Sequence, residues 1–412
     1  MSEAVLSRPA SLLQPARVGT AVRILLVIFL GALPFYINTA LEQIGLFAFS
    51  AAIAAIGLNL LTGTAGQLSL AHAFFVAVGA YGYCYFAGGG GIVDQGVSGL
   101  GLPPLLALVL AVLVTGACGL VLTPIASRLR GIYLGIATLA LIFIGQHVFF
   151  NAAGLTGGFN GRSVEPFAVG GFTFTNTKPD LVVLGVVFGQ YERLWYLGLF
   201  LLVISYLFAK NLLAGRPGRA LQAVRDSEVA GAVMGVSIRR YKAGAFVISS
   251  VYAGLAGALY ALTVSHIVPD SFGFQLTIDY LAMIVIGGLG SVGGAVVGAF
   301  FVSALPLLLN QYSGSIPFLA APGSGGVDAG SFARYIYGGL VILVILFEPE
   351  GMAALGRRLG GRGARRPGVL ARHRRRKATP AAAAAGSDSR GRPRSPAHSV
   401  EPDVAPREET RT

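Results

Sequence analysis

Long apolar runs recur along the chain, and several of them contain no charged residue. Ten of the runs span about 17 to 24 residues, which is the length that a helix needs to cross the hydrocarbon core of a bilayer. The composition agrees, because 54% of the 412 residues are hydrophobic and only 12% are charged. We therefore predict an all-α polytopic membrane protein with about ten transmembrane helices. The predicted helix centres lie near residues 29, 52, 77, 114, 140, 203, 253, 284, 302 and 341.

One apolar stretch, Thr277 to Asn310, is longer than a single upright helix requires, and glycines interrupt it. We predict that it divides into two helices at Gly287 to Gly294. At this point the two parts can be two full crossings or a re-entrant break in the membrane.

Lysine and arginine are unevenly distributed among the segments that connect the apolar runs. Cytoplasmic segments of membrane proteins carry an excess of these residues. With an even number of crossings and both termini in the cytoplasm, only Arg162, Lys178, Arg193 and Arg334 fall outside. The basic residues that then fall inside, before the C-terminal tail, are Arg8, Arg17, Arg23, Arg128, Arg130, Lys210, Arg216, Arg219, Arg225, Arg239, Arg240 and Lys242.

The chain divides into three regions by composition. Residues 1–20 form a cytoplasmic N-terminal segment, and residues 21–350 form a transmembrane domain with a cytoplasmic loop over 214–242 and an external loop over 151–193. Residues 351–412 form a tail that holds fifteen of the 31 basic residues of the chain. This tail is rich in Arg, Pro, Ala, Gly and Ser, so we expect it to be cytoplasmic and largely disordered, with its arginines on anionic lipid headgroups.

The external loop contains alternating apolar residues between Phe167 and Phe174, interrupted by Gly170-Gly171. Such alternation around a glycine pair is typical of a β-hairpin. We expect a small hairpin on the membrane face, although a loop that lies in the interface would show the same pattern.

The stretch from Thr62 to Phe74 places small, flexible and polar residues between two apolar runs that are each long enough to cross a bilayer. In hydrocarbon, irregular backbone is tolerated only where protein or an aqueous cavity satisfies its polar groups. We therefore predict that this break marks a passage for a solute, together with the glycine-rich turn near Gly290. The residues expected to line the pathway or to form its gate are Asn59, Thr62, Gly66, Gln67, Ser69, His72, Gly288, Gly290 and Ser291.

Two of these features have a second interpretation. Gly288 to Gly293 matches GxGxxG, but membrane runs flank it where a nucleotide site needs a strand and a distant acidic residue. Its glycines therefore either allow close helix packing or form a turn that lines the solute route. His72 is either a hydrogen-bonded structural residue or a proton carrier.

The sequence lacks groups that would drive transport from within the chain. Its acidic residues, among them Glu42, Asp270 and Asp279, lie near the ends of predicted spans, and no GxxxxGK[ST] motif is present. Cys84 and Cys118 lie in apolar runs, so neither a metal site nor a catalytic site is expected. A nucleic-acid partner is not expected either, because no aromatic residues accompany the basic tail. Neutral hydrogen-bonding groups along the route suit a small zwitterion or neutral solute that another subunit drives.

The cytoplasmic loop offers a place where such a subunit could attach. Pro217 is suited to the first turn of a helix, and Gly235 is suited to its end. We predict a short polar helix over Arg219 to Met234 with exposed charged residues. Composition alone explains this segment equally well as an ordinary charged loop.

At these residues the chain resembles a known family. In the EAA-type coupling segment of ATP-binding-cassette importer permeases, Glu-Ala-Ala is followed after three residues by Gly, and here Val229 holds the glutamate position and Gly235 the glycine position. The resemblance is to permeases of branched-chain amino acid importers of the LivM type, over about residues 41–356. The motifs that carry it are Gly57-Leu58-Asn59-Leu60-Leu61-Thr62-Gly63, Gly66-Gln67-Leu68-Ser69-Leu70-Ala71-His72-Ala73, Gly131-Ile132-Tyr133, Leu155-Thr156-Gly157-Gly158, Gly218-Arg219-Ala220-Leu221-Gln222-Ala223-Val224-Arg225, Arg240-Tyr241-Lys242 and Gly287-Gly288-Leu289-Gly290-Ser291.

This resemblance implies a multi-pass permease subunit in a bacterial cytoplasmic (inner) membrane. Its implied partners are a LivH-type permease, two cytoplasmic ATPases that use the ATP, and an extracytoplasmic binding protein for leucine, isoleucine or valine. It also implies alternating access without a cofactor in this chain. The residues implied in ATPase coupling are Arg219, Arg225, Asp226, Glu228, Ala230 and Gly235, and those implied in docking the binding protein are Thr156, Gly157, Gly158 and Asn160.

Several alternatives stay open from the sequence. Related permeases carry urea, amides or other amino acids on the same scaffold, and a stand-alone channel or ion-coupled carrier is a different class of transporter. A five-plus-five inverted repeat is possible, because an odd number of spans before residue 190 inverts the second half.

Overall fold

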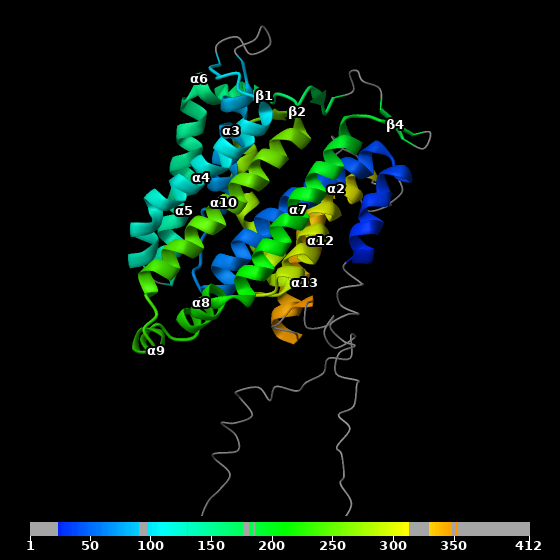
Figure 1. The fold of residues 1–412 in the computed structure, drawn as a ribbon. Helices are drawn as coiled ribbons and strands as arrows, with labels where there is room; N and C mark the ends of the chain where they lie inside the picture. The colour runs from blue at the N-terminus through cyan, green and yellow to red at the C-terminus, as the bar shows by residue number, and fades with distance from the viewer. Residues whose placement is uncertain are drawn as a thin grey trace, which may run out of the picture. The chain divides into compact units, whose positions relative to one another are not determined.

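A computed structural model describes residues 24–89, 97–129, 131–175, 181–183, 186–312, 329–347 and 351–352. The predicted N-terminal segment and nearly all of the predicted tail lie outside these residues. The long helices are Ile24–Phe35, α2 (Thr39–Leu58), α3 (His72–Ala87), α4 (Pro104–Arg128), α5 (Ile132–Asn151), α7 (Gln190–Ala214), α10 (Ile238–Val264), α11 (Phe274–Gly287), α12 (Val292–Gln311) and α13 (Ala329–Phe347) (Figure 1). The shorter elements are α6 (Ala153–Thr156), α8 (Arg216–Asp226), α9 (Glu228–Val233), β1 (Arg162–Ser163), β2 (Ala168–Val169), β3 (Phe172–Thr173), β4 (Leu181–Val183), β5 (Val186–Phe188) and β6 (His266–Ile267).

Each of the ten predicted helix centres falls within one of the long helices in the described part of the chain. Six helices there are long and apolar enough to cross a membrane, and shorter apolar helices accompany them. The prediction of a polytopic helical membrane protein is therefore confirmed. The six are Thr39–Thr64, Pro104–Arg128, Ile132–Asn151, Gln190–Ala214, Ile238–Val264 and Val292–Gln311.

α2 is largely enclosed: 94% of the most apolar window in the span Thr39–Thr64 is buried, against 28–72% in the other five spans named above. It packs against α7, α10 and α12, and α10 also packs against α3 and α4. Glycines permit these close approaches, as expected where helix backbones meet. A Cβ atom at Gly257 would collide with the carbonyl oxygen of Val76, and one at Gly79 would collide with the backbone of Gly254.

α4, α5, α7 and α12 present apolar side chains outward. Only 28–33% of their most apolar windows is buried, and Val121 and Ile132 are 75% and 74% exposed. A soluble monomer rarely exposes contiguous apolar surface of this extent, so these faces fit a surrounding of lipid or partner helices.

The long apolar stretch divides as predicted. α11 ends at Gly287 and α12 begins at Val292, and Gly288 and Gly290 between them have φ angles of 109° and 82°. Such angles favour glycine because other residues are strained there. The Ser291 hydroxyl then accepts a hydrogen bond from Gly294 N and caps α12.

The hairpin predicted between Phe167 and Phe174 is also confirmed. β2 pairs with β3 in antiparallel fashion, and Gly170 and Gly171 occupy the two turn positions with φ angles of 58° and 88°. Two consecutive positive φ angles define the turn type that suits a two-residue hairpin. The rings of Phe167 and Phe174 pack edge to face, with centroids 5.2 Å apart.

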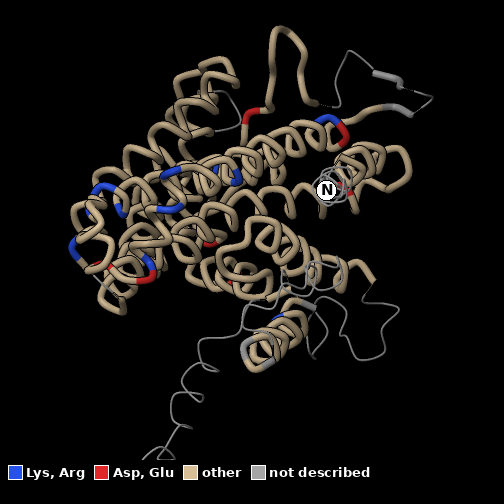
Figure 2. The backbone as a smooth tube through the Cα atoms, turned by 60° about the horizontal axis from the view of Figure 1, so that its bottom comes forward, with Lys and Arg blue, Asp and Glu red and all other residues tan. Residues whose placement is uncertain are grey.

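Basic residues gather toward the end of the bundle where α8 and α9 lie (Figure 2). Fewer lie elsewhere, among them Arg162 and Arg193, which are buried near the strands of the external loop. The basic residues at the α8–α9 end are Arg128, Lys210, Arg216, Arg219, Arg225, Arg239, Arg240 and Lys242.

Candidate functional site

The predicted break after α2 is present. The last turns of this helix widen into a π-helix over Asn59–Thr64, an irregular segment follows, and α3 begins at His72. The segment satisfies much of its own backbone, because the Thr62 hydroxyl donates to the Gln67 carbonyl at 3.1 Å and Gln67 N donates to the Leu61 carbonyl at 3.1 Å. Gly66 supplies a φ of 70° for the turn. Pairing of this kind is what irregular backbone inside a membrane protein requires.

The two glycine-rich breaks lie against each other, although more than 200 residues separate them in sequence. Asn59 Nδ2 donates to the Ser291 carbonyl at 2.9 Å, and Gly290 N donates to Asn59 Oδ1 at 2.8 Å. A Cβ atom at Gly63 would collide with Gly290 N. The structure therefore brings the pathway candidates Asn59, Gly290 and Ser291 together as one clamp.

Ser69 and His72, at the end of the break where α3 begins, are both buried and 2% exposed. The Nε2 atom of His72 lies 2.9 Å from the Ala54 carbonyl, and its ring meets Tyr280 edge to face. The Ser69 hydroxyl accepts a 3.4 Å hydrogen bond from Ala71 N. Both side chains thus have structural partners in this conformation, which favours the hydrogen-bonded interpretation of His72.

Two carboxylates lie near the starts of their helices, as the sequence predicted. Glu42 lies in the first turn of α2, as expected for the end of a span, but it is 1% exposed and neither carboxylate oxygen has a hydrogen-bond partner among the described residues. Asp279 lies in the second turn of α11, where it accepts hydrogen bonds from Tyr337 at 2.7 Å and from Gln275 at 3.0 Å.

The single helix predicted over Arg219 to Met234 is wrong. Pro217 does lie in the first turn of α8, but α8 ends at Asp226 and α9 begins at Glu228. Ser227 between them has extended backbone, and its hydroxyl accepts a 3.2 Å hydrogen bond from Ala230 N. A serine followed by an acidic first turn is an N-cap signal that could have located this break. Gly235, with a φ of 81°, terminates the segment as predicted.

The charged residues of this loop have different roles in the structure. Arg225 and Asp226 are exposed, as predicted, whereas Glu228 is half-buried; Arg219 is exposed as well. Arg225 also reaches back to the break, where its Nη1 donates to the Gly63 carbonyl. Glu228 forms a 2.5 Å ion pair with Lys242 near the start of α10, a partner that the sequence does not indicate.

α9 presents an apolar tip. Val229, Val233 and Met234 are 77–84% exposed, and Ala230 is exposed beside them. Because the segment is short and lies beyond the ends of α7 and α10, this tip is accessible to another protein.

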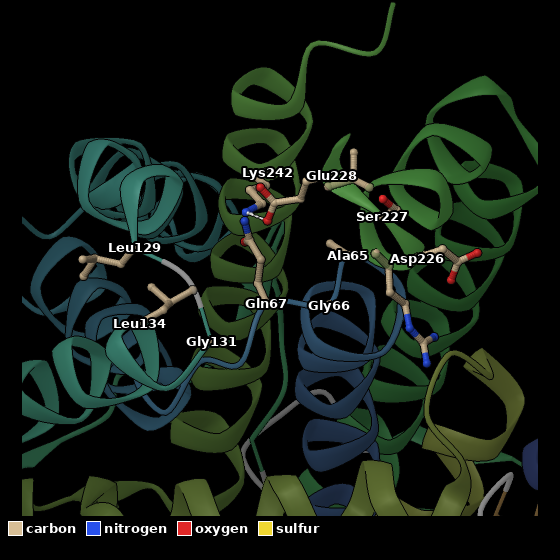
Figure 3. Close-up of a pocket in the computed structure, with 12 residues that line it drawn as sticks. Ala65, Gly66, Gln67, Leu129, Gly131, Leu134, Asp226, Ser227, Glu228 and Lys242 are labelled. Carbon is tan, nitrogen blue, oxygen red and sulfur yellow. Dashed lines mark hydrogen bonds and ion pairs between the residues drawn. The ribbon is translucent and has the colours of Figure 1, made fainter. Parts of the chain in front are cut away.

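A cavity of about 280 Å³ lies between the break, the turn from α4 to α5, and the α8–α9 segment (Figure 3). Gln67 extends from the break toward the Glu228–Lys242 pair, and Leu129 and Leu134 form the facing wall. The cavity thus joins pathway candidates and coupling candidates in one place.

Residues 40–345 match the protein family described as "Branched-chain amino acid transport system / permease component". The chain belongs to this family. It is 30% identical over 358 residues to the high-affinity branched-chain amino acid transport system permease protein LivM of Escherichia coli (strain K12), which covers 83% of this chain and 78% of that protein.

Other relatives of this permease agree. BraD, the high-affinity branched-chain amino acid transport system permease protein of Pseudomonas aeruginosa, is 28% identical over 308 residues, which cover 73% of this chain and 90% of BraD. The probable branched-chain amino acid transport permease protein LivH of Methanocaldococcus jannaschii is 26% identical over 159 residues, which cover 39% of this chain and 44% of LivH. No solved structure matches the chain. The protein is thus a multi-pass membrane permease component rather than an enzyme.

In the permease, the predicted docking residues of the loop over 151–193 differ in burial. Thr156 is 2% exposed, and its hydroxyl donates to the Phe149 carbonyl at 2.6 Å, so it supports the loop from inside. Gly157 and Gly158 have positive φ angles and shape the turn. Asn160 is exposed, and Phe159 beside it is 81% exposed. Phe159 was missed because an isolated aromatic residue in a loop carries no positional signal.

Proposed function

We propose that this permease is the membrane subunit of an ATP-driven importer for leucine, isoleucine or valine in a bacterial cytoplasmic membrane. The observation that carries the proposal is the contact of Arg225 with Gly63, because it links the loop that an ATPase would move to the break in the membrane helices. Gly290 also lies beside this contact, because a Cβ atom built on Gly290 would be 3.4 Å from Arg225 Nη1.

Two cytoplasmic ATPases would bind the α9 tip. Its exposed apolar side chains and the neighbouring exposed charges of Arg219 and Asp226 give it the mixed character of a protein interface. A second, LivH-type permease would complete the pore, and the similarity of this chain to both LivM and LivH proteins supports such a pair of related subunits. A binding protein would dock outside at Phe159 and Asn160.

In this mechanism, ATP bound by the partner subunits closes them and pushes α9. The Glu228–Lys242 ion pair transmits the movement to α10, and Arg225 transmits it to the break at Gly63. Asn59 then couples the break to the turn before α12. Opening toward the loaded binding protein and reversal toward the cytoplasm constitute alternating access, and both arise from the same contacts.

The packing of the helices supports an inverted repeat within the chain. The packing of α2 against α12 has a counterpart in the packing of α10 against α4. Likewise, the packing of α3 against α4 has a counterpart in the packing of α11 against α12. These pairs correspond if the first five helices and the last five have the same fold in opposite orientation. The basic residues at the α8–α9 end support a cytoplasmic position for that end.

Transport by the assembled importer in proteoliposomes tests the proposal. We expect L-leucine uptake that requires ATP and the binding protein, and we expect the triple variant Arg225→Ala, Asp226→Ala, Glu228→Ala to lose both uptake and ATPase attachment. Arg239→Ala with Arg240→Ala, which are exposed at the start of α10, is the matched control and should retain both.

Three outcomes would contradict the proposal. Uptake by this chain alone would indicate a carrier. Uptake of urea or amides that leucine does not inhibit would indicate another solute. A triple variant that still binds ATPases and accumulates leucine would exclude the loop as the coupling element.

A further inference from the structure

The break after α2 contains two buried amide side chains that differ in their hydrogen bonds. Asn59 is 2% exposed, and its amide is bonded on both sides, to the Ser291 carbonyl at 2.9 Å and to Gly290 N at 2.8 Å. Gln67 is 3% exposed, and both of its amide atoms are buried without a hydrogen-bond partner among the described residues. In this conformation, one amide of the break is thus fully paired and the other is left without a partner in the described part of the chain.

The backbone of Gln67 is held firmly, so its unpaired amide does not result from a loose segment. Gln67 N donates to the Leu61 carbonyl, and the Gln67 carbonyl accepts from the Thr62 hydroxyl, each at 3.1 Å. Buried polar groups without partners are rare in folded proteins, because they lose their bonds to water without replacing them. One such group shifts a conformational equilibrium by a factor of about 5 to 150. The present conformation is disfavoured by such a factor against one in which the Gln67 amide has partners.

Groups of suitable chemistry lie in the direction in which Gln67 points. Its side chain extends toward the ion pair of Glu228 and Lys242, whose charged groups meet at 2.5 Å (Figure 3). An ammonium group donates three hydrogen bonds and a carboxylate accepts up to about four, so this pair can bond to an amide without breaking. Hydrogen bonds to charged groups are also stronger than those between neutral groups. A closer approach of the ion pair to the break would therefore give the amide its partners.

We propose that Gln67 is a positioning residue of transport, whose amide lacks partners in this conformation and bonds to the Glu228–Lys242 pair in the conformation that the ATPases produce. In that second conformation, the amide nitrogen donates to Glu228 and the amide oxygen accepts from Lys242. The assignment of the second conformation to the ATP-bound importer rests on the proposed function, whereas the unpaired amide in the present conformation does not.

The two amides then have different roles in the conformational change. Asn59 keeps the break attached to the turn before α12. Compared with an apolar side chain, Gln67 raises the free energy of the present conformation and lowers that of the second. A contact shifts an equilibrium only through its different strength in the two states. Gln67 therefore reduces the part of the change that ATP has to drive.

Gln67→Leu in the assembled importer, in nanodiscs without ATP or solute, tests the unpaired amide. Leucine is of similar size and has no hydrogen-bonding group, so we expect the melting temperature to rise by about 2 °C. Leucine uptake by the same variant, in proteoliposomes with ATP and binding protein, should fall about tenfold. Asn59→Leu is the matched control, because the same change at a paired amide should lower the melting temperature.

Higher stability together with slower transport distinguishes this proposal, since the loss of an amide with a purely structural role would lower both. Gln67→Met, which also lacks an N–H and a carbonyl group, should give the same rise and controls for a clash of the branched leucine side chain. A lower melting temperature for both variants would show that the amide is paired in this conformation, and it would overturn the proposal. Unchanged uptake would overturn it as well.

A double-substitution cycle tests the partner. Glu228→Gln keeps an acceptor for Lys242 but removes the carboxylate, so Gln67→Leu added to it should lower uptake less than about twofold further. Added to Phe159→Ser, which lies beside α6 at the opposite end of the bundle from α9, Gln67→Leu should lower uptake by its full factor (Figure 1). A full effect in both backgrounds would overturn the proposal. Leucine uptake by the unaltered importer reports separately on the proposed function, and the melting temperatures require neither ATP nor solute.

Discussion

The two ends of the helical bundle are fastened in different ways. At the end where the strands lie, β1 pairs with β6 through backbone hydrogen bonds, and Val164 N donates to the Ser265 carbonyl. Buried Arg162 adds donors to the carbonyls of Ser98 and Leu155, at 3.3 Å and 2.7 Å. At the end with α8 and α9, the elements are joined instead by side chains, chiefly Asn59, Arg225 and the Glu228–Lys242 pair.

This difference indicates where the permease can change shape. Backbone pairing that links residues about 100 positions apart fixes the β1–β6 end in one register. Side-chain contacts around a cavity can be exchanged one at a time, with a modest cost for each. We therefore expect the α8–α9 end to move while the β1–β6 end holds the two halves together.

The largest effect is expected in the middle of the bundle, where α10 packs closely against α3. Gly257→Leu forces a side chain into the Val76 carbonyl where α10 meets α3, so we expect loss of folded protein. Gly244→Leu, in the same helix with no atom within 4 Å of its Cβ position, should fold normally. Fluorescence-detected gel filtration measures both. A monodisperse Gly257→Leu protein would show that this contact is not essential.

The next effect concerns the β1–β6 end. Arg162→Met removes two charged hydrogen bonds from a buried position, and we expect a loss of about 2–4 kcal/mol with a lower melting temperature. Arg219→Met, at an exposed site, should stay within about 0.5 kcal/mol of the parent protein. Thermal unfolding in detergent measures both variants. Equal melting temperatures would mean that Arg162 does not secure this end.

At the α8–α9 end, we expect substitutions to change stability less than Arg162→Met does, and to change the coupling of uptake to ATP hydrolysis more. Asn59→Leu removes both hydrogen bonds of the clamp, and we expect a stability loss of about 1–3 kcal/mol. Leucine uptake per ATP hydrolysed should fall several-fold, because movement of the break after α2 is no longer transmitted to the turn before α12. Asn211→Leu, at an exposed position near the end of α7, is the control. Unchanged coupling in Asn59→Leu would show that the clamp is only structural.

The smallest effect is expected in the external loop. Phe159→Ser changes an 81% exposed side chain, so stability should stay constant while the binding protein concentration that gives half-maximal uptake rises a few-fold. Thr156→Val, which removes a buried hydroxyl, should lower the melting temperature without this shift in concentration. The reverse pattern would assign docking to Thr156, as the sequence had suggested.

The sequence predicted the local features of this fold well. Ten apolar runs located the helices, and Gly170-Gly171 located the hairpin, because hydrophobic length and turn chemistry are encoded by neighbouring residues. The break at Ser227 was missed although its cap signal is local. Here the helical composition on both sides outweighed a single polar residue.

Contacts between distant residues could not be predicted. The hydrogen bond between Arg225 and Gly63 joins residues 162 positions apart, so no local pattern indicates it. The burial of Glu42 depends on how the neighbouring helices pack around the start of α2, and the unpaired amide of Gln67 depends on a cavity made by three segments. Single-sequence periodicity says which face of a helix is apolar, but not which neighbour covers it.

The enclosure of α2 has a consequence for how this protein is made. Its covering helices α7, α10 and α12 are synthesised after it, so the newborn α2, with buried Glu42 and Asn59, first meets lipid instead of its final neighbours. Polar side chains are costly in that setting. The helices that finally cover this segment are complete only after more than two hundred further residues have been synthesised, so we expect it to be among the last parts of the chain to reach its final packing.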